Sequence, residues 1–441
     1  MKKRSITRRV ITVQKRIVFA LAIVLAFLLV AGCGGERQPA AENSPVAENP
    51  PKPVKLKVFF ASNVGNDYYN TLVVEPIKKT FPHITLELIP FGQKLPDLLA
   101  SGNAPDLIFD GLTNLIPTLE LDVPLSLDEL AKRNKFDFSK IQPEVIKEIR
   151  SYSKTDELLA WPQANHWFGL HYNKDIFDLF GVPYPKEGST WEEVMELAAK
   201  LSRTYEGIEY RGISPGVSHN RLSTQLSAPY AEPKTEKSMI GTHESWRKLF
   251  QTYKDVFSIP GNYPKGAAYN DAAKAFMTEK KLAMYPHLLM FPDPKLGFNM
   301  GVTTFPFFKD KPWVGPSGFI EVIVISKTTK NPDAAFQVVA HLTSDEVQTR
   351  NARLGMNPVV TNSQAQMSLF ADLPAAKGTD LTPFFKMKHA ESYGKTIYDA
   401  AGSKAVIKYL QEFIDGKLDL NTALARADEE TNKAIEEQKK K

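Results

Sequence analysis

The sequence contains one cysteine among 441 residues, so no disulfide can form within the chain. It has no Gly-x-x-x-x-Gly-Lys-Ser/Thr phosphate loop, which argues against a nucleotide-hydrolysing protein. The eight histidines are scattered, and none has the companions expected of a zinc site. The sequence therefore predicts neither a metal nor another cofactor.

The first sixteen residues carry seven Lys or Arg side chains and no acid. The apolar run IVFALAIVLAFLLVAG follows at 17–32. This order of a basic and then an apolar segment is typical of a secretory signal peptide. A run of sixteen residues is shorter than the ~20 that a membrane-spanning helix needs. We therefore predict that residues 1–32 are a signal peptide.

The four residues at 30–33, VAGC, resemble the lipobox of bacterial lipoproteins. This resemblance implies that Cys33 carries lipid, palmitate included, and becomes the first residue of the mature chain. Residues 34–53 are rich in Gly, Pro, Ala, Asn and Glu, and they contain no apolar run. Such a segment buries too little surface to fold, so 33–53 is expected to be a flexible, lipid-anchored linker on the outer face of the cell membrane.

The net charge changes when the signal peptide is removed. The formal charge of +5 includes the seven basic residues of the signal, and without them it becomes −2. A chain with this balance offers no broad electrostatic attraction to nucleic acid, so we expect no nucleic-acid partner.

The remaining chain of about 390 residues is long enough for two domains. Apolar residues alternate at 54–60 and 84–88, and 106–109 is a short apolar run. Helix-compatible segments lie between them at 68–79 and 94–100. This alternation predicts a doubly wound α/β lobe with a parallel sheet.

Ligands of such sheets bind beyond the carboxyl ends of the strands. Polar or glycine residues follow all three predicted strands: ASN at 61–63, FGQ at 91–93 and DG at 110–111. We therefore expect a polar pocket suited to hydroxyl groups at this edge.

Several later elements are also readable. Thr190 and Glu193 form a capping-box pattern at the start of a helix. Asn331 precedes a proline, which predicts another helix start. The run EVIVI at 321–325 predicts a strand, and the tract 405–441 predicts helix. We expect Trp191 and Trp246, which lie on helix faces, to be core residues.

The Gly-x-Ser-x-Gly pattern at 212–216 does not predict a hydrolase. In that motif the backbone N–H after the serine helps form the oxyanion hole, and here this residue is Pro215, which has no N–H.

From Gly169 the sequence reads GLHYNKDIFDLFGVPYPKEGSTWEEVMELAAKL, which resembles the central signature of the family 1 extracellular solute-binding proteins, the sugar-binding components of ABC importers. Further blocks follow in the order of that family: APDL at 104–107, AFMTEKKLAMYP at 275–286, GVTTFPFFK at 301–309, GPSGF at 315–319 and LTSDEVQ at 342–348. Glu279 and Ser317 stand where the family usually has glycine.

The resemblance implies a two-lobed, periplasmic-binding-protein-like fold. Each lobe would be a mostly parallel sheet flanked by helices, with the ligand cleft at the hinge. Lobe 1 would comprise 54–163 and about 305–355, and lobe 2 would comprise 164–304 and about 356–441. The protein would be a monomeric receptor, not an enzyme, that binds a carbohydrate such as an oligosaccharide and delivers it to ABC permease subunits.

A sugar has apolar ring faces and a rim of hydroxyl groups, so its site needs aromatic rings together with carboxylates or amides. The aromatic candidates are Trp161, Trp167, Trp313 and Phe319. The other candidates are Asn63, Asp67, Gly92, Asp110, Asn165, His166 and Ser317. Because Trp161 and Trp313 lie beside prolines, we expect them to face the cleft. Trp167 fits a core position equally well, and Asp67 fits a helix cap.

Two other functions are compatible with the sequence. A surface glycoside hydrolase needs two carboxylates that are paired in space, which a sequence does not reveal. A sensory or adhesive lipoprotein could use the same fold for a non-sugar solute. The first would release products, and the second would lack a cognate permease.

Overall fold

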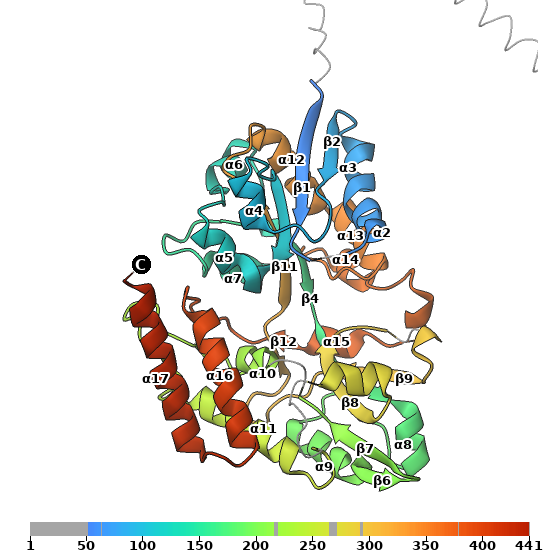
Figure 1. Ribbon diagram of the computed structural model, residues 1–441. Coiled ribbons are helices and arrows are strands. Elements are labelled where there is room, and N and C mark those ends of the chain that lie inside the picture. The colour runs from blue at the N-terminus through green and yellow to red at the C-terminus, as the bar shows by residue number, and fades with distance from the viewer. Residues whose placement is uncertain are drawn as a thin grey trace, which may run out of the picture. The chain divides into compact units, whose positions relative to one another are not determined.

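The computed structural model describes residues 52–440, except residues 63, 216–218, 264–270, 292–293 and 378. The unit Lys52–Lys441 contains two lobes, each with its own five-stranded sheet and hydrophobic core (Figure 1). The predicted signal peptide, Cys33, Asn63 and the linker up to residue 51 lie outside the described residues. In the part of the chain that the structure describes, no helix is both long and apolar enough to cross a membrane.

The first sheet has the strand order β2-β1-β3-β11-β4. Its strands are β1 (Val54–Phe60), β2 (Ile84–Leu88), β3 (Leu107–Gly111), β4 (Trp161–His166) and β11 (Phe319–Ile325). β1 pairs in parallel with β2 and β3, whereas β11 is antiparallel to β3 and β4. The alternation at the start of β1 places Leu56 and Val58 in the core, which confirms the predicted strand.

A continuous helical segment follows β1 and comprises α2 (Asn66–Tyr69), the π-helical η1 (Asn70–Val74) and α3 (Glu75–Thr80). The other helices of this lobe are α4 (Leu95–Ala100), η2 (Leu112–Asn114), α5 (Leu115–Glu120), α6 (Asp128–Arg133), η3 (Phe138–Lys140), α7 (Pro143–Arg150), α12 (Pro332–Leu342), α13 (Asp345–Arg353) and α14 (Ser363–Met367). α12 begins where predicted, although the side chain of Asn331 makes no capping hydrogen bond.

The second sheet has the order β6-β7-β8-β5-β9. Its strands are β5 (Phe168–Asn173), β6 (Arg203–Tyr205), β7 (Ile208–Ile213), β8 (Leu282–Leu288) and β9 (Met300–Thr304). Only the pair β7 and β8 is parallel. Both sheets are therefore mixed, and the expectation that each is mostly parallel is wrong in that detail. β5 and β11 enter their sheets directly from the other lobe, without the crossover helix that makes neighbouring strands parallel.

The elements around the second sheet include a helix with the predicted capping box. At the start of α9 the Thr190 hydroxyl accepts from the Glu193 N–H, and the Glu193 carboxylate accepts from the Thr190 N–H. Trp191 and Trp246 are buried, which confirms the predicted core positions. The remaining elements are α8 (Lys174–Phe180), α9 (Trp191–Leu201), α10 (Asn220–Gln225), α11 (Glu244–Ser258), η4 (Lys274–Thr278), η5 (Pro294–Leu296), β10 (Val314–Gly315), η6 (Pro374–Ala376), α15 (Thr382–Lys386), β12 (Lys388–His389), α16 (Asp399–Ile414) and α17 (Leu420–Gln438).

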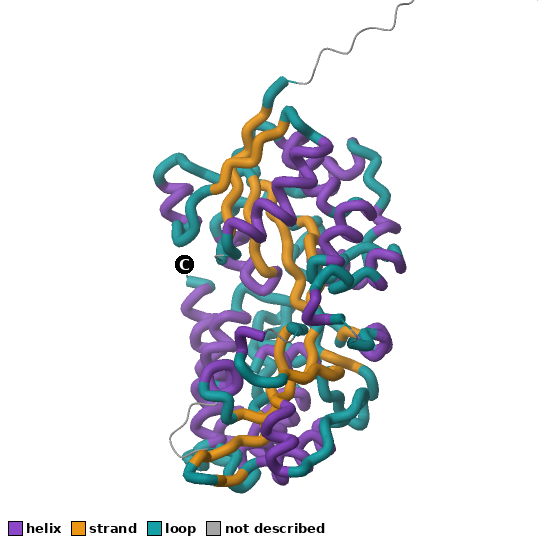
Figure 2. Tube along the Cα trace, turned by 90° about the vertical axis from the view of Figure 1, so that its right-hand side faces the viewer, coloured by secondary structure: helices purple, strands orange, loops and turns teal. Residues whose placement is uncertain are grey.

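The chain passes between the lobes three times: from β4 to β5, from β9 to β11, and from α14 to α15 (Figures 1 and 2). Phe305 and Phe308 pack in the core of the second lobe, and Val359 and Val360 pack in the core of the first. The exact lobe boundaries given above stay a prediction. The crossings bring β4 and β11 together at the waist of the unit, where the site is assembled.

Candidate functional site between the lobes

The two neighbouring strands β4 and β11, which we call the hinge strands, have two different faces. His166 lies opposite Phe319, and Asn165 lies opposite Ile320. Side chains alternate along a strand, so Phe319 and Glu321 lie on one face and Ile320 lies on the other. Each face borders a separate cavity.

The strand-end cavity lies at the carboxyl ends of β1 and β3 and has a volume of about 140 Å³. Its lining residues are Phe60, Ser62, Val64, Tyr68, Phe109, Asp110, Gly111, Gln163, Phe319 and Glu321. This is the edge of the parallel strands where α/β sheets bind their ligands. The cavity combines aromatic rings with two carboxylates, an amide and a hydroxyl group, which are the groups that a polyhydroxylated solute requires.

Glu321 is the best-partnered carboxylate of this cavity. The Tyr68 hydroxyl donates to its Oε2 at 3.0 Å, and His166 Nε2 lies 3.1 Å from its Oε1. Burial by itself raises the pKa of Glu321, but the hydrogen bonds and the charge of His166 outweigh burial, and the pKa lies below its usual value. Burial and the neighbouring Glu321 raise the pKa of Tyr68 well above its usual value. Glu321 is therefore held as a carboxylate.

Asp110 is the second carboxylate of the cavity and lies in β3. Burial raises its pKa, and hydrogen bonds from Asn114 and from the Gly111 N–H offset part of this effect. The bonds are 3.0 and 2.7 Å long and both reach the same oxygen, Oδ1. The other oxygen, Oδ2, accepts neither of these bonds, so Asp110 retains an acceptor for a ligand hydroxyl group.

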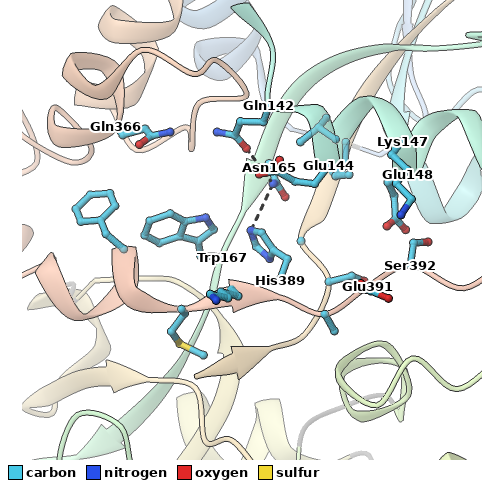
Figure 3. Close-up of a pocket in the computed structure, with 18 residues that line it drawn as sticks. Gln142, Glu144, Lys147, Glu148, Asn165, Trp167, Gln366, His389, Glu391 and Ser392 are labelled. Carbon is cyan, nitrogen blue, oxygen red and sulfur yellow. Dashed lines mark hydrogen bonds between the residues drawn. The ribbon is translucent and has the colours of Figure 1, made fainter. Parts of the chain in front are cut away.

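The α7 cavity lies on the other face of the hinge strands and is larger, about 500 Å³. Figure 3 shows its walls. From the first lobe come Gln142, Glu144, Val145, Lys147, Glu148 and Gln366; from the hinge come Asn165, Trp167, Ser317, Gly318 and Ile320; from the second lobe come Phe385, Met387, Lys388, His389, Ala390, Glu391 and Ser392. Volume alone favours this cavity, but it lies away from the carboxyl ends of the parallel strands. We therefore assign the solute site to the strand-end cavity.

Asn165 and Trp167 occupy the centre of the α7 cavity wall (Figure 3). The buried Asn165 amide donates to Gln142 Oε1 and lies near His389 Nε2, both at 3.4 Å, and thereby links the two lobes. The ring of Trp167 packs against Phe384 and Phe385, with ring centres 6.4 and 5.0 Å away. These contacts indicate that this face joins the lobes structurally.

The predicted site residues are thus divided between the two faces. Asp110 and Phe319 line the strand-end cavity, and His166 reaches it through Glu321. Asn165, Trp167 and Ser317 line the α7 cavity instead.

Four further candidates line neither of these cavities: Asp67, Gly92, Trp313 and Trp161. Asp67 is exposed inside the first turn of α2, so it is not the helix cap, which is Gly65. Gly92 is exposed in a turn with φ +88°. Trp313 is half-buried and its ring lies 5.7 Å from that of Phe307.

The expectation that Trp161 faces the cleft is wrong. Its side chain is fully buried, and Nε1 donates to the Thr343 hydroxyl at 3.0 Å. Its ring packs edge-on against Phe136 and Phe336, with centres 4.6 and 5.1 Å away. Trp161 is therefore a core residue of the first lobe.

The sequence analysis included Ser62 in a strand end expected at the pocket, but it missed Glu321 and Tyr68, which also line the cavity. Glu321 had a readable signal, because it is the only charged residue in the apolar run of β11. Tyr68 had none, since its partner Glu321 is remote in sequence and only the folded sheet brings them together.

Comparisons with known proteins agree with this architecture. A family model described as bacterial extracellular solute-binding protein matches residues 62–349, more than half of the chain. The chain is 23% identical over 301 residues to the multiple sugar-binding protein of Streptococcus mutans, covering 63% of this chain and 68% of that one. It is 22% identical over 397 residues to the sn-glycerol-3-phosphate-binding periplasmic protein UgpB of Rhizobium meliloti, covering 84% and 88%.

Among solved structures, the substrate-binding protein Lmo0181 of Listeria monocytogenes in complex with cycloalternan superposes with a TM-score of 0.68 at 18% identity. The match covers 87% of this chain and 99% of that one. A likeness at this identity shows a shared two-lobed fold.

Proposed function

This chain belongs to the bacterial extracellular solute-binding protein family, and from that premise we propose that it is a receptor that binds a carbohydrate at the strand-end cavity. The carrying observation is the position of that cavity, where Asp110, Glu321 and Ser62 gather beside Phe319 at the carboxyl ends of β1 and β3. Carboxylates and hydroxyl groups would bind the sugar hydroxyls, and the ring would cover an apolar sugar face.

The solutes of similar proteins support a polyhydroxylated ligand. One relative is named for multiple sugars, another for sn-glycerol 3-phosphate, and the Listeria protein holds cycloalternan. All of these solutes carry several hydroxyl groups. The hinge strands allow the lobes to rotate, and a solute that contacts both lobes favours their closed arrangement.

The same proposal includes a tether and a partner. Cys33 would hold the receptor at the outer face of the cell membrane by its lipid, and 34–53 would let it move there. The loaded monomer would deliver its solute to the permease subunits of an ABC importer. Labelled palmitate incorporated by the wild type but not by Cys33→Ser would support the tether, and equal incorporation would contradict it.

Thermal unfolding tests the proposed binding. The chain 33–441, carrying Cys33→Ser, is melted with a panel of mono- and oligosaccharides. A ligand at ~100 times its Kd adds about 2.7 kcal/mol to the free energy of unfolding, which raises Tm visibly.

The solute recovered after the melt separates the alternatives. Intact sugar supports a receptor, and cleaved sugar supports the glycoside hydrolase. If no sugar raises Tm, this would contradict the carbohydrate assignment and favour a sensory or adhesive role.

A further inference from the structure

Arg221, the second residue of α10, is a cation without a carboxylate partner in the part of the chain that the structure describes. Among the described residues no acid forms an ion pair with it, and its Nε is buried without a hydrogen-bond partner. Its guanidinium lies 5.7 Å from the ring centre of Phe168. Another arginine of this lobe, the buried Arg211, binds Asp271 through two bonds of 2.8 and 2.7 Å. Within the described residues, the fold thus pairs Arg211 with a carboxylate and leaves Arg221 without one.

Three more polar atoms without hydrogen-bond partners among the described residues lie on β8 or directly after β7. The Ser214 hydroxyl, the Tyr285 hydroxyl and His287 Nδ1 are buried and form no hydrogen bond with the described residues. Ser214 directly follows β7, and its N–H donates to the Met284 carbonyl at 3.4 Å. Leaving such a buried group unpaired destabilises the folded protein. A group of them at one place indicates a missing partner.

These polar groups lie close together on the second sheet, and the charge of Arg221 acts on His287. Tyr285 and His287 are two residues apart in β8, so they lie on one face of the sheet, with ring centres 4.8 Å apart. Burial, together with the charges of Arg221 and His171, lowers the pKa of His287 to about 3, so its ring is neutral at pH 7. β7 and β8 are the parallel pair of this sheet, and their carboxyl ends are where its ligand is expected.

This edge lies at the boundary between the lobes. Figure 1 shows α10 at the end of the second lobe that faces the first. Directly after β8, Phe291 packs on Phe370 with ring centres 4.3 Å apart. Near Phe370, the side chain of Asn351 donates to the Leu72 carbonyl at 3.0 Å, and Leu72 packs in one cluster with Tyr68 of the strand-end cavity.

We propose that the solute carries an anionic group, a carboxylate or a phosphate on its polyol frame, and that Arg221 binds this group together with the Tyr285 hydroxyl, the Ser214 hydroxyl and His287. The proposal rests on the proposed receptor function and extends it to the class of solute. Charge-assisted hydrogen bonds of arginine to such oxygens are about twice as strong as neutral ones. The first lobe would bind hydroxyl groups through Asp110 and Glu321, and the second lobe would bind the anion.

Matched solutes test this division by titration calorimetry on the chain 33–441 with Cys33→Ser. The sets are glucose, glucuronate and glucose 6-phosphate; galactose and galacturonate; and glycerol and sn-glycerol 3-phosphate. We expect at least one anionic member to bind at least tenfold more tightly than its neutral counterpart. Comparison of glucuronate with glucose 6-phosphate distinguishes a carboxylate from a phosphate.

Variants assign the effect to Arg221. Arg221→Gln should lower the affinity for the anionic solute by tenfold or more and change the affinity for its neutral counterpart by less than twofold. Arg221→Lys should restore part of the affinity for the anionic solute. Arg247→Gln, a substitution of a partly exposed arginine on α11, is the matched control and should change neither.

The outcomes separate the two proposals. Tighter binding of a neutral sugar would overturn the proposal that the solute is anionic and leave the receptor function intact. So would an affinity for the anionic solute that Arg221→Gln does not change. Binding by no member of any set, neutral or anionic, would count against the receptor function itself.

Discussion

His166 and Glu321 lie on neighbouring hinge strands, and His166 Nε2 approaches the Glu321 carboxylate to 3.1 Å. The pair joins one crossing of the chain to another at the border of the strand-end cavity. The contact connects two strands that run between the lobes, so we expect the charge of Glu321 to influence both stability and solute binding.

Glu321→Gln should change how stability depends on pH. The folded pKa of Glu321 is depressed, so its contribution is present above the ordinary glutamate pKa of about 4.3 and is lost as pH falls through the lower folded pKa. We expect wild type to lose more Tm than Glu321→Gln between pH 6 and pH 3. Thermal melts across this range give the answer, with exposed Glu209→Gln as control. Parallel Tm curves for wild type and Glu321→Gln would contradict the prediction.

Asp110→Asn should separate binding from stability. The substitution removes a carboxylate whose pKa is raised by burial, and asparagine keeps an oxygen for Gly111 and Asn114. We therefore expect unchanged or slightly higher Tm, with about tenfold weaker solute binding from the loss of a charge-assisted bond. Calorimetry and melting on the same samples measure both. Asp97→Asn, at an exposed position of α4, should leave affinity unchanged, and an unaltered affinity in Asp110→Asn would remove this residue from the site.

Trp161→Phe should lower the stability of the protein and leave its solute affinity unchanged. Phenylalanine loses the bond to Thr343 and leaves space beside Phe136 and Phe336, so the free energy of unfolding should fall by about 2 kcal/mol. Solute affinity should stay within twofold, because the side chain is fully buried in the core. Urea unfolding and titration measure the two quantities. A large loss of affinity with normal stability would return Trp161 to the site.

Lys395→Met should leave two carboxylates without their cation. Glu148 of α7 and Asp399 at the start of α16 both have pKa values raised by burial, and Lys395 opposes this effect at each. The methionine can keep the contact with the Tyr393 ring, which the lysine nitrogen approaches to 3.6 Å. We expect a loss of about 1–3 kcal/mol at pH 7. This loss should shrink as pH falls towards 4.5 and the carboxylates protonate.

The pH dependence is the informative part of that experiment. Melts of wild type, Lys395→Met and exposed Lys404→Met at pH 7 and 4.5 provide the comparison. A deficit that is the same at both values would mean that Lys395 acts through packing alone.

Local patterns predicted local structure well. The alternation of β1 and the capping box of α9 depend on residues that are neighbours in the sequence, and both occur as predicted. The strand ends also indicated Asp110, which lines the strand-end cavity, because the geometry of parallel strands fixes where their carboxyl ends meet.

Contacts between residues that are distant in the sequence could not be predicted from such local patterns. A proline beside Trp161 suggested a loop, yet Phe136, Phe336 and Thr343 enclose the ring from distant parts of the chain. The sequence also could not show that Arg221 has no carboxylate partner among the described residues, since only the fold shows which charges lie together.

The place of β11 in the first sheet bears on how this protein is made. β11 lies between β3 and β4, although it is synthesised long after both of them. The first sheet therefore stays open along its middle until the chain has returned from the other lobe, and contacts so remote in sequence form slowly. Completion of the first sheet is therefore a late step for this topology, which suits a polypeptide of an extracellular family that must cross a membrane before it folds.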